Sequence, residues 1–375
     1  MSNVSRREFL KSLGAAALVA LAGRRLPVFA ASADAFEFLV VGDSLIFGQG
    51  LLEKDKIYTH VAEWLRTEAF GAPRNVRLKV KAHSGSTLKF HAEEAEKYRK
   101  AGRDEVFYYK PEVNVAFPST WKQIEVAAAE YKGEGKPEGA DLVMLSGCVT
   151  DITVAKVLDP DGDNTLLRQQ AEKYCQHDML DVLRHAAENN PNAVIAVVGY
   201  FPMLSPASKK SRIFNSWLES MGFPRLLKPI ANNPITRKLY FERLGRRALK
   251  RSQIWNDESN KHLQIAVDRF NAAPAGGTRA VFIRSPLTEE NAFEAPKTLL
   301  FRMGKGGRSD DPMYDERRAD CRAALPELKR TTGIEYPVRY CEIAGVGHPN
   351  PQGARLYADA IESSIQSLLT QAAIK

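Results

Sequence analysis

The chain has 375 residues, of which 44% are hydrophobic and 26% are charged, and its formal net charge is +8. This balance is typical of a globular protein with a sizeable core and excludes a disordered or largely membrane-embedded chain. Residues 1–33 have a net charge of +4 and residues 209–251 a net charge of +10, so the remaining residues have a net charge of −6. The protein is therefore an acidic body that carries one basic segment.

The first 33 residues have the pattern of an export signal. Arg6 and Arg7 precede Phe-Leu-Lys, an apolar run follows over 13–22, and small residues suited to cleavage lie near Ala30 and Ala33. The apolar run is about half of the ~20 residues that span a bilayer. The pattern resembles a Tat signal peptide, and a retained N-terminal anchor is the alternative. We expect a periplasmic or secreted protein.

After this signal, apolar runs of strand length alternate with amphipathic helical patterns. Strands are predicted at 36–41, 76–80, 142–145, 193–198 and 280–283, and helices at 58–70, 166–187, 256–270 and 354–369. Strands that alternate with helices predict a parallel sheet covered on both faces. Residues 34–375 are expected to form one domain, with insertions at about 89–139 and 201–254 that do not fit this alternation.

The four cysteines show no C-x-x-C pair and no metal-ligand spacing with histidine, so no metal site is predicted. An oxidising destination would permit disulfides, and Cys321–Cys341 is the favoured pair on sequence distance. Four buried thiols are the alternative.

A serine directly follows the first strand, in the sequence Val41-Gly42-Asp43-Ser44-Leu45. The carboxyl ends of parallel strands are where functional sites collect. A nucleophilic serine needs a base and amide donors for the oxyanion that forms. The G-x-S-x-G elbow of α/β-hydrolases is absent, because Ile46 stands at its last position.

Three further motifs follow in chain order: Ser84-Gly85-Ser86 after the second strand, residues 147–151 (Gly-Cys-Val-Thr-Asp) after the third, and His348 before the last helix. With Ser44, they resemble the SGNH (GDSL) hydrolase family. The resemblance implies a three-layer α/β/α sandwich with a flavodoxin-like parallel sheet of about five strands. It also implies an esterase that uses no metal and no organic cofactor.

Carried over from the family, Ser44 would be the nucleophile and its backbone N–H an oxyanion donor. The N–H of Gly85 would be a second donor, and His348 the general base and then the general acid. Thr150 stands where the family has asparagine; its hydroxyl can donate one hydrogen bond but reaches less far than an amide.

The catalytic acid of the family has no equivalent at the expected position. The family carries aspartate three residues before the histidine, where this chain has Gly345. His348 therefore needs another orienting partner, which could be a backbone carbonyl, Asp151 or Glu342. A serine–histidine dyad oriented by a carbonyl is chemically sufficient.

We expect an exported serine esterase that hydrolyses an acyl or acetyl ester of a small molecule, lipid or glycan through an acyl-enzyme. The alternatives are acyl transfer to a cell-envelope glycan and a catalytically weak scaffold that binds anionic lipid or glycan. Basic and aromatic residues alternate in 209–251, which suits contact with an anionic membrane surface, and a solvated cover is the other interpretation. No nucleic-acid partner is expected, because no groove-reading motif is present.

Overall fold

The computed structural model describes residues 35–209, 213, 242–273 and 279–373. The predicted signal peptide and most of the basic segment lie outside these residues. The described residues from Phe36 onward belong to one compact unit.

A five-stranded parallel sheet forms the centre of this unit. Its strands are β1 (Phe36–Val41), β2 (Val76–Val80), β3 (Leu142–Leu145), β4 (Val194–Val198) and β5 (Ala280–Ile283). They pair in the order β2-β1-β3-β4-β5, and every pairing is parallel. Every residue of β1, β3 and β4 is buried, as expected for apolar strands covered on both faces. The predicted α/β fold with about five parallel strands is confirmed.

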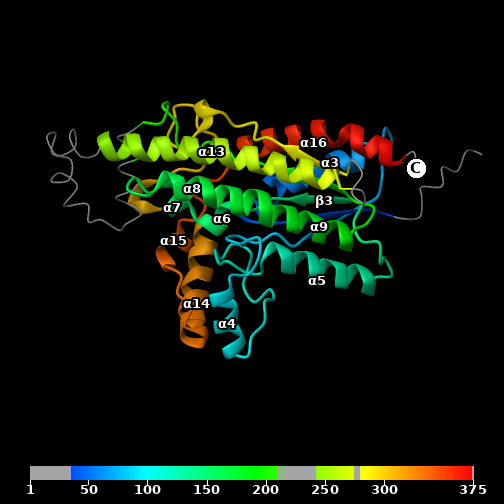
Figure 1. The fold of residues 1–375 in the computed structure, drawn as a ribbon, viewed down its shortest axis with the longest axis horizontal. Coiled ribbons are helices and arrows are strands. Elements are labelled where there is room, and N and C mark those ends of the chain that lie inside the picture. Colours follow the sequence, from blue (N-terminus) through cyan, green and yellow to red (C-terminus); the bar gives the residue numbers. More distant parts are fainter. Residues whose placement is uncertain (1–34, 210–212, 214–241, 274–278, 374–375) are drawn as a thin grey trace, which may run out of the picture. The chain divides into compact units, whose positions relative to one another are not determined.

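Helices cover both faces of the sheet (Figure 1). On one face, α3 (Ile57–Thr67) packs against α16 (Pro351–Ala373). On the other, α9 (Met179–Asn189) contacts both α5 (Thr120–Gly133) and α13 (Glu242–Asn271). The sandwich therefore has the three predicted layers.

Short elements connect these layers. They are α2 (Ser44–Phe47), α6 (Val149–Ile152), α7 (Val154–Leu158), α8 (Asn164–Ala171), a π-helical stretch at Glu172–Asp178, and 3₁₀ turns at Glu53–Asp55, Glu289–Asn291 and Lys305–Gly307. The helix predicted at 166–187 thus consists of α8, the π-helical stretch and α9. The helix predicted at 256–270 begins earlier, at Glu242. Among the described residues, no helix has the length and apolar character needed to cross a membrane.

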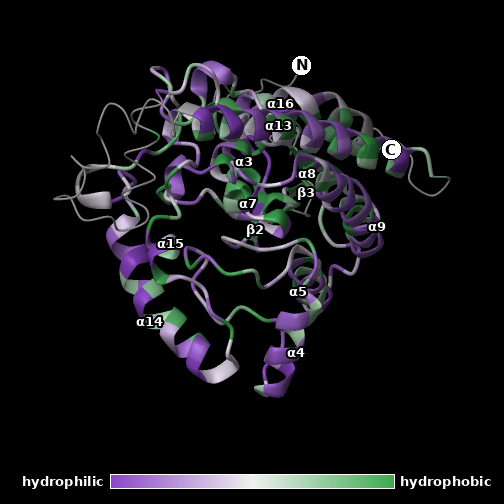
Figure 2. Cartoon of the chain, turned by 60° about the vertical axis from the view of Figure 1, so that its left-hand side comes forward, coloured by the Kyte–Doolittle hydropathy of each residue, from purple (hydrophilic) through white to green (hydrophobic). Residues whose placement is uncertain are grey.

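A second, smaller hydrophobic cluster lies beside the sheet, between α4 (Ala92–Lys100), α14 (Tyr314–Thr332) and α15 (Val338–Glu342). Figures 1 and 2 show α4 and α14 projecting from the same side of the layered body. Buried Tyr98, Phe117 and Leu325 belong to its core. The range predicted as an insertion at 89–139 thus contains two helices. Helix α4 contributes to the second hydrophobic cluster, and α5 contacts β1.

Two disulfides cross-link the described chain. The predicted pair Cys321–Cys341 is confirmed and joins α14 to α15, with Cα atoms 5.9 Å apart. The second, Cys148–Cys175, was not predicted as a pair; it joins the loop after β3 to the π-helical stretch, with Cα atoms 5.3 Å apart.

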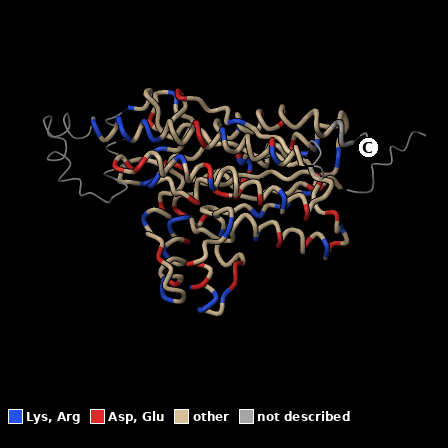
Figure 3. The backbone as a smooth tube through the Cα atoms, in the orientation of Figure 1, with Lys and Arg blue, Asp and Glu red and all other residues tan. Residues whose placement is uncertain are grey.

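Residues 242–251 of the basic segment form the first turns of α13, where Figure 3 shows basic residues close together. Two of these arginines are engaged within the protein. Arg247 pairs with Asp161 at 2.8 Å, and Arg251 is buried and donates to the carbonyl oxygens of Lys156 and Val157. These contacts reduce the positive charge that a surface partner could reach. Contact with an anionic membrane stays a prediction.

Candidate active site

A tight turn after β1 places Ser44 at the carboxyl end of the sheet. Gly42 has φ +133°, and a Cβ there would lie 2.3 Å from the carbonyl oxygen of Ser146, so only glycine fits. Asp43 then caps α2, its Oδ1 accepting from the N–H of Leu45 at 3.1 Å. Ser44 is the first residue of α2 and is 9% exposed. The turn therefore fixes the serine at the edge of the core.

Asp43 also ties together the loops that follow three strands. Its carboxylate accepts a hydrogen bond from Ser146 Oγ at 2.7 Å and another from the hydroxyl of Tyr200. Burial raises the pKa of Asp43, although these hydrogen bonds oppose the shift. Because its partners come from the loops after β3 and β4, Asp43 supports the turn that carries Ser44.

The structure brings His348 to Ser44, 304 positions away in the sequence. His348 Nε2 lies 2.8 Å from Ser44 Oγ, within hydrogen-bonding distance. The backbone carbonyl of His348 accepts a hydrogen bond from the N–H of Phe301 at 2.8 Å, and this bond holds the loop that carries the histidine. Burial, and after it the charge of Arg317, lower the pKa of His348 to about 4. The imidazole is therefore neutral at pH 7 and can accept the serine proton.

The other ring nitrogen of His348 has no carboxylate partner. Nδ1 is buried without a hydrogen bond to any described residue. The carbonyl groups of Ala344 and Gly345 lie close enough to favour the charged imidazole and so raise its pKa. The nearest orienting groups are thus backbone carbonyls, one of the three alternatives left open by the sequence.

The two carboxylates considered as orienting acids have other partners. Asp151 accepts from the N–H of Leu88 at 3.2 Å and lies 3.6 Å from His91 Nε2. Glu342 pairs with Arg322 and with Arg339. Asp151 therefore braces the loop after β2, and its role as a supporting acid stays a prediction that these contacts do not favour.

The predicted oxyanion donors are two backbone N–H groups and the Thr150 hydroxyl. Neither the N–H of Ser44 nor that of Gly85 makes a hydrogen bond within the described chain, so both are available. The Thr150 hydroxyl, in contrast, donates to the carbonyl oxygen of Ser86. An oxyanion could accept a hydrogen bond from this hydroxyl only if the bond to Ser86 broke.

Gly85 is held closely by the segment that crosses the loop after β2. Its φ is +84°, and a Cβ there would lie 2.2 Å from Asn114 Oδ1 and 2.7 Å from the Val115 carbonyl oxygen. The N–H of Val115 donates to the carbonyl of Ser84 at 3.2 Å. Glycine is therefore required at position 85 both by the backbone conformation and by the lack of space.

A buried cluster of charges that the sequence does not predict lies behind the histidine loop. Arg317 is fully buried and pairs with Asp311 at 2.6 Å and with Glu112 at 2.9 Å. No local spacing could reveal this cluster, because its members come from two distant parts of the chain. The one available signal was Gly345, which lacks the carboxylate expected near the base.

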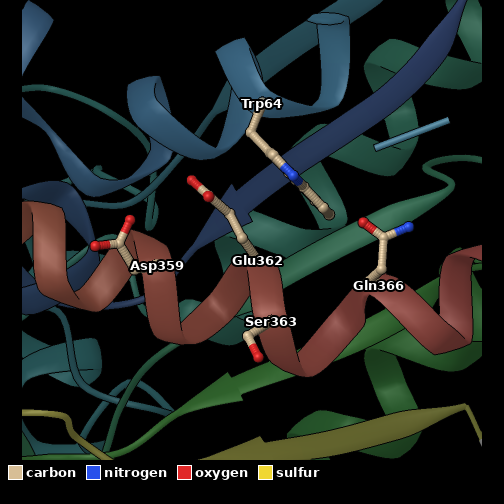
Figure 4. A pocket seen from close by; sticks show the side chains of 5 residues that line it. All are labelled: Trp64, Asp359, Glu362, Ser363 and Gln366. Atoms are coloured by element: carbon tan, nitrogen blue, oxygen red, sulfur yellow. The ribbon is translucent and has the colours of Figure 1, made fainter. Parts of the chain in front are cut away.

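An open hollow of about 380 Å³ lies elsewhere, between α3 and α16. Figure 4 shows Trp64 of α3 facing the α16 side chains Asp359, Glu362 and Gln366, with Ser363 beside them. Neither Ser44 nor His348 lines this hollow, and no paired nucleophile and base occurs among its residues. The Ser44–His348 pair is therefore the better candidate for an active site.

No protein family model and no curated protein matches the chain. Among solved structures, it is similar to the lipase Lip_vut3 from a goat rumen metagenome, with 12% identity, a TM-score of 0.40, and coverage of 88% of this chain and 97% of that one. The extracellular lipase from Streptomyces rimosus is 12% identical, with a TM-score of 0.41 and coverage of 88% and 100%. A family two carbohydrate esterase from Clostridium thermocellum, in complex with cellohexaose, is 11% identical, with a TM-score of 0.39 and coverage of 89% and 65%.

Proposed function

We propose that this protein is an exported serine esterase that hydrolyses a carboxylic ester through an acyl-enzyme on Ser44. The observation that carries the proposal is the 2.8 Å contact between Ser44 Oγ and His348 Nε2. The contact joins a serine at the end of a central strand to a histidine that burial keeps neutral. A nucleophile paired with a neutral base is the minimum that acyl transfer requires.

The reaction follows from this geometry. Ser44 Oγ attacks the ester carbonyl carbon while His348 Nε2 takes the hydroxyl proton. The negative charge that develops on the carbonyl oxygen is stabilised by the N–H groups of Ser44 and Gly85. His348 then donates the proton to the departing alkoxide, which leaves as an alcohol. Water attacks the acyl-enzyme by the same route, with His348 again taking and returning a proton.

The class of substrate is part of the proposal. Two of the similar structures are lipases and one is a carbohydrate esterase. These names support an acyl or acetyl ester of a lipid or glycan as the substrate of this chain.

A fluorophosphonate probe tests the nucleophile directly, because it phosphonylates an activated serine. We expect wild-type protein to be labelled at Ser44, as located by peptide mass spectrometry, and Ser44→Ala to remain unlabelled. Ser363→Ala is the matched control, since Ser363 is an exposed serine in the hollow between α3 and α16. Equal labelling of Ser44→Ala and wild type, or no labelling of folded wild type, would contradict the proposal.

Export is a second part of the proposal, supported by the twin arginine and the short apolar run of residues 1–33. The double change Arg6→Lys with Arg7→Lys should leave uncleaved precursor in the cytoplasm, measured by fractionation and immunoblotting. The single control Lys11→Arg keeps the twin arginine and should be exported normally. Normal export of the double variant would rule out the Tat route.

A further inference from the structure

The space beside Gly345 is filled by a carboxylate from a distant segment. A Cβ at position 345 would lie 2.3 Å from Asp311 Oδ2 and 3.0 Å from a guanidinium nitrogen of Arg317. Gly345 does not have a positive φ, so its backbone does not itself require glycine. Asp311 therefore occupies the space into which a side chain three residues before His348 would extend.

Asp311 also touches the loop that carries the nucleophile. Gly50, six residues after Ser44, has φ +85°, and a Cβ there would lie 3.0 Å from Cβ and Cγ of Asp311. The carboxylate side chain is fully buried. Asp311 thus lies between the Ser44 loop and the His348 loop and contacts each at a glycine. Any movement of Asp311 would disturb both loops, because close-packed interiors transmit small displacements.

Arg317 fixes the Asp311 carboxylate in this position. Its two terminal nitrogens donate to the two oxygens of Asp311 at 3.0 Å and 2.6 Å, and the N–H of Met313 adds a bond at 3.0 Å. Arg317 also donates to Glu112 at 2.9 Å and to the carbonyl of Glu342 at 3.2 Å. A bidentate pair in a buried setting is rigid in both distance and orientation.

Glu112 extends the cluster back to the nucleophile loop. It accepts from Gln49 Nε2 at 2.8 Å and from the N–H of Gly50 at 3.2 Å. Arg317 therefore faces two carboxylates, and the neutral substitution Asp311→Asn would still leave Arg317 paired with Glu112. This redundancy makes it possible to remove one carboxylate without leaving the buried guanidinium alone.

The cluster also acts on the charge of His348. Burial is the main cause of the lowered pKa of His348. In addition, the charge of Arg317 lowers this pKa and the charge of Asp311 raises it. During the proposed reaction His348 becomes an imidazolium, which a nearby carboxylate stabilises without taking the proton. Asp311 would thus favour the charged form of the base while Arg317 holds the carboxylate in place.

We propose that Asp311, held by Arg317, is a positioning residue of His348 that acts through the histidine loop at Gly345, without a direct hydrogen bond to the imidazole. This inference rests on the proposed esterase function and names a residue that acts through the base.

The first test replaces Asp311 with asparagine, which keeps the side-chain shape but removes the charge. We expect kcat for a p-nitrophenyl ester to fall by roughly 10- to 100-fold with little change in KM, because the imidazolium forms only along the reaction path. The pKa of His348, followed by NMR of the ring, should fall below its wild-type value. Asp315→Asn is the matched control, since Asp315 is exposed and pairs with Arg308; it should leave both quantities unchanged.

The second test moves the carboxylate to position 345. Asp311→Ala alone should lower kcat. Asp311→Ala combined with Gly345→Asp should have a kcat at least tenfold higher than Asp311→Ala, since the new side chain extends into the vacated space. We expect the new carboxylate, three residues before His348, to raise the pKa of the histidine. Because neutral imidazole is the active base, the acid limb of the pH–rate profile should then move to higher pH.

The readouts separate the two proposals. If wild type and Ser44→Ala have equal turnover, the esterase function fails, and the NMR titration still decides whether Asp311 acts on His348. If wild type is active in a Ser44-dependent manner but Asp311→Asn keeps both kcat and the His348 pKa, Asp311 is not a positioning residue. Activity losses that track only a lower Tm, with no rescue by Gly345→Asp, would show that Asp311 is purely structural.

Discussion

Replacing Ser44 or His348 with alanine is expected to lower kcat for a p-nitrophenyl ester by about 10⁴-fold or more. Ser44→Ala removes the proposed nucleophilic oxygen, and His348→Ala removes the proposed base, which lies 2.8 Å from it. Because the two side chains act as one unit, the double variant should be only slightly worse than either single variant. Steady-state kinetics on the three variants provides the measurement.

Two controls accompany this experiment. The variants should keep the circular dichroism spectrum of wild type, since neither side chain belongs to the hydrophobic core. Ser363→Ala should keep full turnover, because Ser363 lies in the hollow between α3 and α16 and not at the site. If Ser44→Ala retained most of its activity, Ser44 would not be the nucleophile.

Gly85→Ala is expected to impair both stability and turnover. The new Cβ would approach Asn114 Oδ1 to 2.2 Å and two Val115 backbone atoms to 2.7 and 2.8 Å, in a backbone conformation at φ +84° that alanine disfavours. We expect the free energy of unfolding to fall by about 2–4 kcal/mol, combining the strained φ with overpacking. Displacement of the Gly85 N–H should lower kcat by roughly 10²-fold, as the loss of an oxyanion donor does.

Gly71→Ala separates the effect of the strained φ from the effect of overpacking. Gly71 has a similar φ of +68°, but nothing lies within 4 Å of a Cβ there. It should therefore show only the cost of the backbone conformation, about 1 kcal/mol in the free energy of unfolding, and unchanged kcat. Urea denaturation and kinetics on both variants give the comparison. If Gly85→Ala behaved like Gly71→Ala, the loop after β2 would have room to relax, and Gly85 would not hold an oxyanion donor.

The sequence alone determined the layered fold and placed the two side chains of the proposed active site. Strands β1, β3, β4 and β5 are apolar runs bounded by turn residues, so their length and composition reveal them without tertiary information. Ser44 could be placed because it follows β1, and His348 because it precedes α16, whose start is marked by Asn350 and Pro351. These signals are local, and parallel topology then brings the carboxyl ends of the strands together.

Only the tertiary structure decided which groups surround the pair of Ser44 and His348. Asp151 and Thr150 follow β3 as predicted, yet their side chains bond the loop after β2, to Leu88 and Ser86. Of the buried pair, Arg317 lies in α14 and Asp311 just before it, and the strand–helix alternation does not predict this helix. Such partners are set by packing between distant segments, because a buried charge requires a counter-charge wherever the fold can supply one. No residue spacing encodes that choice.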